Sequence, residues 1–108
     1  SREALPPLRR RMMDDNSPEA AFAAAAVAKI DPSANVGTRF YELMRNKLPV
    51  NRWTATQYIP DYVDPEVAEK RLVARYEVED DPTTCSMIAW SLNKLGERHA
   101  TNMFIRNP

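Results

Sequence analysis

The residues best suited to catalysis or metal binding are a single cysteine, Cys85, and a single histidine, His99. A structural zinc site needs about four convergent ligands, whereas these two residues lie near opposite ends of one expected helix. A Cys–His nucleophilic pair would also need a third group to orient the base. The sequence therefore predicts no catalytic residue, no metal site and no cofactor. Cys85 is interpreted as a small core residue, and a small enzyme that uses it is the alternative ranked last.

An acidic run from Glu77 to Asp81 is the second feature that could bind an ion. An EF-hand calcium loop requires oxygen ligands at alternating positions and a central glycine, and the run has neither. Phosphate-binding loops need clustered glycines, whereas Gly37 and Gly96 stand alone. We interpret the run as a solvated hinge that ends in a helix-capping residue, Asp81.

A basic arm, residues 1–16, contains three consecutive arginines, Arg9, Arg10 and Arg11. Such a cluster could contact RNA phosphates or an acidic groove on a protein. The arm is short and has no aromatic residue, and the whole chain is neutral, with 15 basic and 15 acidic residues. A second basic cluster is interpreted as the solvent-facing side of a helix; its members are Arg39, Arg45, Lys47 and Arg52.

Proline marks the starts of the elements that must position these residues. Serine or aspartate is followed directly by proline at 17–18, 31–32, 64–65 and 81–82. Serine and aspartate are strong N-caps, and proline suits the first helical position. The pattern predicts helices over residues 18–29, 32–47, 65–76 and 82–96, with a short one between 51 and 58. Gly37 weakens the second helix, so a start at Thr38 is its alternative, and a continuation through His99 is the alternative end of the last helix. The chain has only two glycines and no dipeptide typical of a β-hairpin turn, such as Asn-Gly. The sequence therefore favours an all-α fold of four or five short helices.

Bulky apolar residues are few for a chain of 108 residues. Alanine supplies 14 of the hydrophobic residues, and Leu, Ile, Val and Phe together number 21. A low content of this kind limits the apolar surface that a small chain can bury. We expect one domain over residues 1–108, partly extended rather than a compact bundle, with a C-terminal tail from residue 97. Some apolar residues are then expected to cover a partner's surface.

The connector over residues 48–62 is the strongest candidate for that contact. It is rich in aromatic residues and is expected to be rich in turns, with an interruption at Pro60. Trp and Tyr dominate interface hot spots, although these rings could also cap the chain's own core. The predicted partner-contact residues are Trp53, Tyr58, Tyr62, Pro65, Phe104 and Ile105.

The connector also resembles a known family. Leu48-Pro49 is followed by Trp53-Thr54 and then by Tyr62-Val63-Asp64-Pro65. This spacing is similar to that of the ubiquinol–cytochrome c reductase binding protein, the small matrix-side subunit of the mitochondrial cytochrome bc1 complex. Val63 and Asp64 stand where that family has Leu and Glu. The family's upstream Arg-Leu-Pro element is absent, and the chain beyond residue 81 extends past the expected end of the family.

The resemblance implies an all-helical accessory subunit without a redox centre, packed against cytochrome b on the matrix side of the inner membrane. Such a subunit supports assembly and stability of a respiratory complex. The leading prediction is therefore a non-catalytic subunit of a larger protein complex. The alternative is a nucleic-acid-associated structural protein, organellar ribosomal or viral, that uses Arg9 to Arg11. The longest apolar run, residues 20–28, is shorter than the about 20 residues that cross a bilayer, so no membrane span is expected.

Overall fold

The structure, a computed structural model, describes the backbone of residues 2–106 and the side chains of residues 2–99. A 3-10 turn, Arg2–Ala4, precedes six α-helices in this part of the chain. The helices are α1 (Leu5–Met12), α2 (Ala20–Ile30), α3 (Gly37–Leu43), α4 (Pro49–Tyr62), α5 (Pro65–Val78) and α6 (Pro82–Arg106). No strand occurs within residues 2–106. The predicted all-α fold is confirmed, with six helices rather than four or five.

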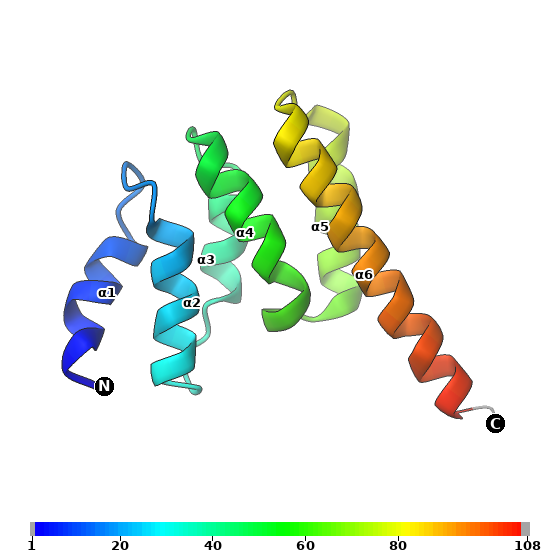
Figure 1. Cartoon of the computed structure of the whole chain (residues 1–108), viewed down its shortest axis with the longest axis horizontal. Coiled ribbons are helices and arrows are strands. Elements are labelled where there is room, and N and C mark those ends of the chain that lie inside the picture. Colours follow the sequence, from blue (N-terminus) through cyan, green and yellow to red (C-terminus); the bar gives the residue numbers. More distant parts are fainter. Residues whose placement is uncertain (1, 107–108) are drawn as a thin grey trace.

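The helices form two layers (Figure 1). Helices α2, α4 and α6 lie side by side in the front layer, with α1 beside α2, and α3 and α5 lie behind them. Helix α4 packs against both α2 and α6, while α3 packs on α4 and α5 packs on α6. The Cα atoms span 46 × 33 × 16 Å. The short dimension fits two helical layers with axes about 8–10 Å apart.

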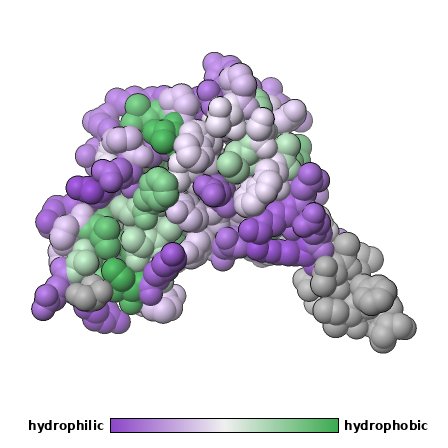
Figure 2. Space-filling model, viewed as in Figure 1, coloured by the Kyte–Doolittle hydropathy of each residue, from purple (hydrophilic) through white to green (hydrophobic). Residues whose placement is uncertain are grey.

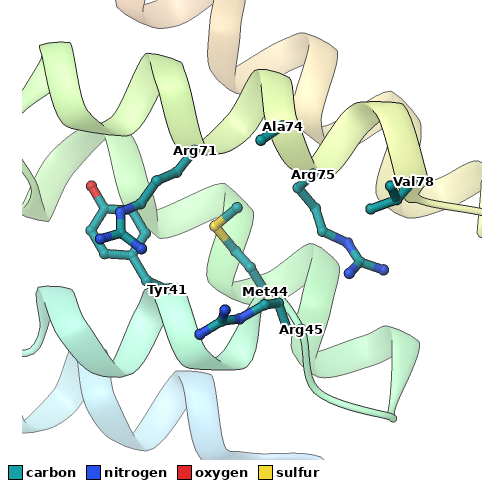
Figure 3. A pocket seen from close by; sticks show the side chains of 7 residues that line it. All are labelled: Tyr41, Met44, Arg45, Arg71, Ala74, Arg75 and Val78. Carbon is teal, nitrogen blue, oxygen red and sulfur yellow. The ribbon is translucent and has the colours of Figure 1, made fainter.

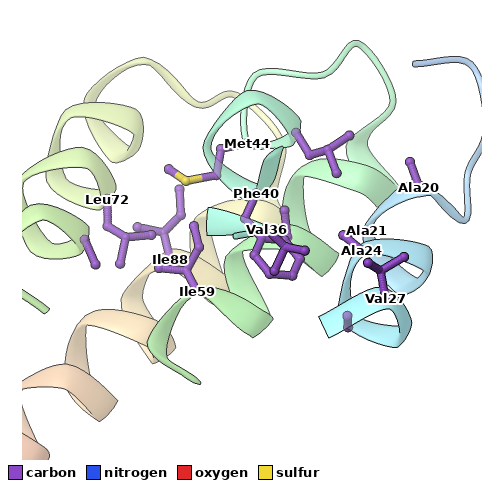
Figure 4. Packing of buried hydrophobic residues seen from close by; sticks show 14 of the residues in the cluster. Ala20, Ala21, Ala24, Val27, Val36, Phe40, Met44, Ile59, Leu72 and Ile88 are labelled. Atoms are coloured by element: carbon purple, nitrogen blue, oxygen red, sulfur yellow. The ribbon is translucent and has the colours of Figure 1, made fainter. Parts of the chain in front are cut away.

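The molecule is compact, which corrects the expectation of a partly extended arrangement. One core joins both layers, and Figure 4 shows fully buried residues from four helices meeting in it: Phe40, Ile59, Leu72 and Ile88. The radius of gyration is 14.6 Å, near the about 13 Å expected for a compact chain of this length. Small buried alanines on α2, such as Ala21, let neighbouring backbones approach closely. Few bulky residues therefore suffice to close the core.

Two of the four predicted helix starts are confirmed together with their caps. Asp64 Oδ1 accepts a hydrogen bond from the backbone amide of Glu66 at 2.9 Å, directly before α5. Asp81, the residue directly before α6, accepts a hydrogen bond at its Oδ2 from the backbone amide of Thr84 at 2.9 Å. Each cap satisfies an amide that has no partner inside the helix. These starts are local features that the sequence identifies correctly.

The other two Ser/Asp-Pro pairs form turns instead of helix starts. Ser17 Oγ accepts from the amide of Glu19 at 3.2 Å, but α2 begins only afterwards. Asp31 Oδ1 accepts from the amide of Ser33 at 3.2 Å, and α3 begins only at Gly37, one residue before the alternative start at Thr38. The same side-chain bond closes an isolated turn. The capping signal therefore does not decide whether a helix follows.

The predicted turn-rich connector is instead the continuous helix α4, and a contact with α6 explains why. Pro60 lies inside the helix and lacks the N–H that would bind the carbonyl of Thr56. The buried hydroxyl of Ser91 on α6 donates to that carbonyl at 2.7 Å. The guanidinium of Arg98 donates to the carbonyl of Pro60 itself. Helix α4 continues through its proline because α6 satisfies the vacated acceptor.

Replacing Ser91 with alanine is expected to lower the free energy of unfolding by about 1–2 kcal/mol, because the buried carbonyl of Thr56 loses its donor. In a Pro60→Ala background the alanine amide can bind that carbonyl, so Ser91→Ala should then cost clearly less. Urea unfolding of the four chains in this double-mutant cycle measures the difference. Equal costs in both backgrounds would refute the proposed role of Ser91.

The basic arm and the C-terminal tail are both helical, which corrects their prediction as separate appendages. Helix α1 lies within residues 1–16, packs on α2 and buries Leu5. Helix α6 continues through Gly96 to Arg106. The side chains of Phe104 and Ile105 lie outside the described residues.

The buried side of α6 is partly polar. Ile88 and Leu95 are buried. Thr84 and Ser91 are also buried, whereas Ala89 is exposed. Both hydroxyls have hydrogen-bond acceptors, and a satisfied polar group can be buried at low cost. A pattern that counts only apolar residues misses Thr84 and Ser91.

Candidate partner-binding groove

A groove of about 200 Å³ separates α3 and α5, the two helices of the back layer (Figure 3). In Figure 3 the Met44 side chain points from α3 toward the gap, and Arg71 reaches from α5 over the ring of Tyr41. The lining residues are Tyr41, Met44, Arg45, Arg71, Ala74, Arg75 and Val78. Because α3 and α5 pack mainly on the front layer and not on each other, their facing sides line a hollow.

Buried residues next to the lining residues determine which sides of α3 and α5 face the groove. Phe40 anchors α3 and is fully buried, and Ala68 and Leu72 anchor α5 in the same way. Successive residues on an α-helix are rotated by about 100°. Tyr41 and Arg71, each adjacent to an anchoring residue, therefore emerge on the flanks of their helices and face the groove.

The groove is basic. Three of its seven lining residues are arginines and none is acidic. Arg75 is neutralised by Glu79, with 3.0 Å between Nε and Oε1. The guanidinium of Arg71 lies 4.4 Å from the centroid of the Tyr41 ring, a cation–π contact. Within residues 2–99 neither Arg45 nor Arg71 is paired with a carboxylate, so two positive charges flank an apolar floor.

The hydroxyl of Tyr41 is a further unsatisfied group at the groove. It is buried and has no hydrogen-bond partner within the described side chains and backbone. Burial raises the pKa of the Tyr41 hydroxyl; Arg71 acts in the opposite direction, and Asp64 adds to the rise. An unpaired buried polar group costs about 1–3 kcal/mol, so native proteins retain few of them.

A buried ion-pair cluster around Glu79 holds one end of the groove. The Glu79 side chain is 0% exposed, and its Oε1 accepts from Arg52 Nε at 2.9 Å and from Arg75 Nε at 3.0 Å. Burial acts to raise the pKa of Glu79, but the hydrogen bonds from Arg52, the Asp81 amide and Arg75 together hold it below its ordinary value. The ionised carboxylate fixes the guanidinium of Arg75. The sequence predicts a solvated hinge over the acidic run from Glu77 to Asp81, and for Glu79 that interpretation is wrong because its side chain is buried.

Most of the predicted partner-contact residues belong to α4 and lie outside the groove lining. Tyr58 and Tyr62 are half-buried, and their rings pack against Phe40 with centroids 5.7 Å and 5.5 Å apart. Trp53 is also half-buried, and Pro65 is exposed at the first position of α5. The two tyrosines thus cover the chain's own core, the second role that the sequence left open for them. Contact of this set with a partner stays a prediction.

A second apolar area lies on the front face, over α1 and α2 (Figure 2). Phe22 on α2 is 50% exposed and packs edge-to-face against Tyr58 with ring centroids 6.1 Å apart. Scattered exposed apolar residues are normal on a protein surface. The groove differs because it combines an apolar floor with unpaired charges and an unpaired hydroxyl.

The arginines of the predicted basic arm are mostly neutralised within the chain. Arg9 pairs with Asp31 at 3.1 Å, and Arg11 pairs with Glu19 at 3.5 Å. Arg10 is exposed on α1. The cluster that the sequence offered for nucleic-acid contact therefore already has acidic partners in the two turns that flank α2.

Only half of the second basic cluster faces solvent, which corrects its interpretation in part: Arg45 and Lys47 are exposed, whereas Arg39 and Arg52 are buried. Arg39 is only 7% exposed and donates to Asp15 and to the carbonyl of Met12, both at 2.7 Å. Arg52 is buried against Glu79. These two arginines tie α3 and α4 to distant segments of the chain. Of the cluster, Arg45 lines the groove.

Cys85 and His99 lie on the same helix, α6, and do not meet. Cys85 is half-buried, with its Sγ 3.4 Å from the carbonyl of Glu79, and His99 is exposed. In the described part of the chain no three His, Cys, Asp or Glu side chains gather to hold a metal ion. Nor is any described helix apolar over a length that would cross a bilayer.

The groove was not identified from the sequence, although a signal was present. Residues at spacings of four and three along α5 share a side of that helix that differs from the side buried with Leu72. These residues are Val67, Arg71, Ala74 and Val78. A helix with apolar residues on two sides has two surfaces to cover, and only one of them is the core.

The groove lining combines three arginines and one tyrosine with apolar side chains, and its seven residues include no carboxylate, histidine, cysteine or serine. No family model, curated protein or solved structure matches this chain.

Proposed function

We propose that this chain is a non-catalytic helical subunit that joins a larger protein assembly through the α3–α5 groove. One observation carries the proposal: Arg45 and Arg71, unpaired with any carboxylate in residues 2–99, flank an apolar floor beside the unsatisfied hydroxyl of Tyr41. Arginine, tyrosine and methionine are the residues enriched in protein interfaces. A partner would neutralise the charges and cover the floor.

The exposed surface of α5 supports the same proposal. Only Ala68 and Leu72 of its fourteen residues are buried. Its exposed apolar residues are Val67, Val73, Tyr76 and Val78, between 42% and 69% accessible. Apolar residues gathered on one exposed helix favour a protein-binding role over a purely structural one.

The resemblance over Leu48 to Pro65 suggests which assembly this is. It supports an accessory subunit of a respiratory bc1-type complex on the matrix side of the inner mitochondrial membrane. In that setting the chain would stabilise the complex without transferring electrons. Trp53 and Pro65, which are accessible in part or in full, would provide further contacts with neighbouring subunits.

Charge reversal in the groove tests the proposal. Arg71→Glu is expected to reduce the partner subunits that co-purify with the tagged chain from its source cells by roughly tenfold, the loss produced by about 1.4 kcal/mol of binding free energy. The matched control is Arg10→Glu, the same substitution at an exposed arginine of α1. Quantitative mass spectrometry of the purified assemblies gives the measurement. Equal recovery with both variants would contradict a docking role for the groove.

A further inference from the structure

The two unpaired arginines of the α3–α5 groove come from opposite helices, about one helical turn apart. The guanidinium of Arg71 lies 4.4 Å from the centroid of the Tyr41 ring. Arg45 follows Tyr41 by four residues, a rise of about 6 Å along a helix. The backbone still turns at that point, because the amide of Arg45 donates to the carbonyl of Glu42 at 3.0 Å. Figure 3 shows Arg71 over Tyr41 and Arg45 beside Met44.

The acidic residues nearest to these arginines in the sequence do not neutralise them. Glu42, three residues before Arg45, is paired with Arg39 at 3.5 Å. Glu69, two residues before Arg71, lines a different hollow of α5, because residues two apart on a helix do not face each other. Both arginines are exposed. Within residues 2–99 they are therefore available to carboxylates from outside the chain.

We infer that the groove binds an acidic amphipathic helix of a partner protein, with two carboxylates one turn apart and apolar side chains on the same face. The inference rests on the proposed function, because it takes the groove as a protein-binding surface. The two carboxylates would pair with Arg71 and Arg45, and the apolar side chains would cover Met44, Ala74 and Val78. Arginine and carboxylate form strong paired hydrogen bonds, and charge complementarity of this kind gives protein interfaces their specificity.

The size of the groove favours side chains of a polypeptide over a small molecule. Its volume is about 200 Å³, below the about 300–1,000 Å³ of small-molecule sites. Along α5 its lining runs from Arg71 to Val78, which spans about 10 Å, or two helical turns. One row of side chains from a docked helix, at spacings of three and four residues, matches that length.

A helix fits this site better than an extended segment does. An extended partner is held by main-chain hydrogen bonds to the edge of a sheet, and no strand occurs within residues 2–106. A helix instead satisfies its backbone polar groups internally and presents only side chains.

Nucleic acid fits less well. Proteins that bind it tightly neutralise about 6–10 phosphates, whereas this groove offers two unpaired arginines beside an apolar floor, on a chain with no net charge.

Fluorescence anisotropy of labelled synthetic peptides with the purified full chain tests the inference. The probes are alanine-based helices of about 20 residues with two glutamates four residues apart. Leucine, isoleucine, methionine and phenylalanine are placed in turn on the same face. We expect at least one probe to bind with a Kd of about 100 µM or tighter, and to bind less tightly as salt is added. The same probe with both glutamates changed to glutamine should bind roughly tenfold more weakly.

Variants of the chain identify the contacts. Arg71→Glu and Arg45→Glu should each weaken binding of the best probe roughly tenfold. Changing one probe glutamate to lysine should restore binding to Arg71→Glu, and changing the other should restore binding to Arg45→Glu. Ala74→Phe, which fills the groove without altering charge, should abolish binding. Arg10→Glu is the matched control and should bind like the unmodified chain, while circular dichroism checks that every variant is folded.

Several results would overturn the inference. One is a set of probes that all bind more weakly than about 1 mM in low salt; another is equal binding of the best probe to the unmodified chain and to both folded charge reversals. Tighter binding of a ten-residue single-stranded RNA, lost in Arg45→Glu, would assign the groove to nucleic acid. Self-association that Arg71→Glu abolishes would assign it to a second copy.

The same measurements separate this inference from the proposed function. If no probe binds but Arg71→Glu still loses cellular partners that Arg10→Glu keeps, the groove docks a protein of other chemistry, and only the inference fails. If the best probe binds as expected but both variants keep all their cellular partners, the proposed function fails instead.

Discussion

Replacing Phe40 with alanine is expected to lower the free energy of unfolding by about 4 kcal/mol. The side chain is fully buried between α3 and α4, and its ring packs against those of Tyr58 and Tyr62 at 5.7 Å and 5.5 Å. The substitution removes this contact area and leaves a cavity that tight neighbours cannot fill. Small domains have only about 5–15 kcal/mol of stability in total, so the loss is a large fraction.

Urea unfolding followed by circular dichroism measures this loss. Phe22→Ala is the matched control, because Phe22 makes an aromatic contact with the same Tyr58 but is 50% exposed. It should cost about 1 kcal/mol or less. If Phe40→Ala leaves too little folded protein, Phe40→Leu should cost about 1–2 kcal/mol and remain measurable. Equal losses at positions 22 and 40 would contradict the core described for α3 and α4.

Glu79→Ala should have the second-largest effect, a loss of about 3 kcal/mol or more in the free energy of unfolding. Its carboxylate, 0% exposed, is the counter-ion of Arg52, which is itself only 8% exposed. Removing it leaves a buried guanidinium unpaired, and it also releases Arg75 and the amide of Asp81. The loss should therefore be measured by urea unfolding at neutral pH, where the carboxylate is ionised.

The same cluster predicts a pH dependence with a defined sign. The pKa of Glu79 is lower in the folded chain than its ordinary value, because the bonds from Arg52 and Arg75 outweigh the opposing effect of burial. A lowered carboxyl pKa adds stability at pH values above the ordinary pKa, and this stability is lost as the pH falls through the folded pKa. Stability should thus fall below about pH 4–5, and Glu79→Gln should flatten that fall. Glu69→Gln, the same substitution at an exposed carboxylate of α5, is the matched control.

The all-helical class and the starts of α5 and α6 followed from local chemistry. Asp64 and Asp81 cap the amides two or three residues ahead of them, and such short-range bonds need no help from distant parts of the chain. Ser17 and Asp31 make similar bonds, yet no helix starts directly there. A cap stabilises a helix that other interactions already favour, so the pattern predicts turns as readily as helices.

The candidate site was harder to predict, because the role of an arginine depends on its tertiary partner. Arg39 and Arg52 are buried counter-ions, while Arg45 and Arg71 line a groove with no paired carboxylate among the described residues. Their side chains are chemically identical, and their sequence neighbourhoods gave no basis for separating them. The predicted contact rings of Tyr58 and Tyr62 meet Phe40 instead, because α4 turns them toward α3.

The amino-acid sequence alone determined that the chain is helical and where α5 and α6 begin, because these properties depend on residue types and on bonds within one helical turn. Tertiary structure decided that α4 runs through Pro60. The carbonyl of Thr56, which Pro60 leaves without a donor, accepts its hydrogen bond from Ser91, thirty-five positions further along the chain. Tertiary structure also decided that α3 and α5 stand apart and form a basic groove. Long-range contacts select which polar groups are paired and which remain available, and residue spacing does not encode that selection.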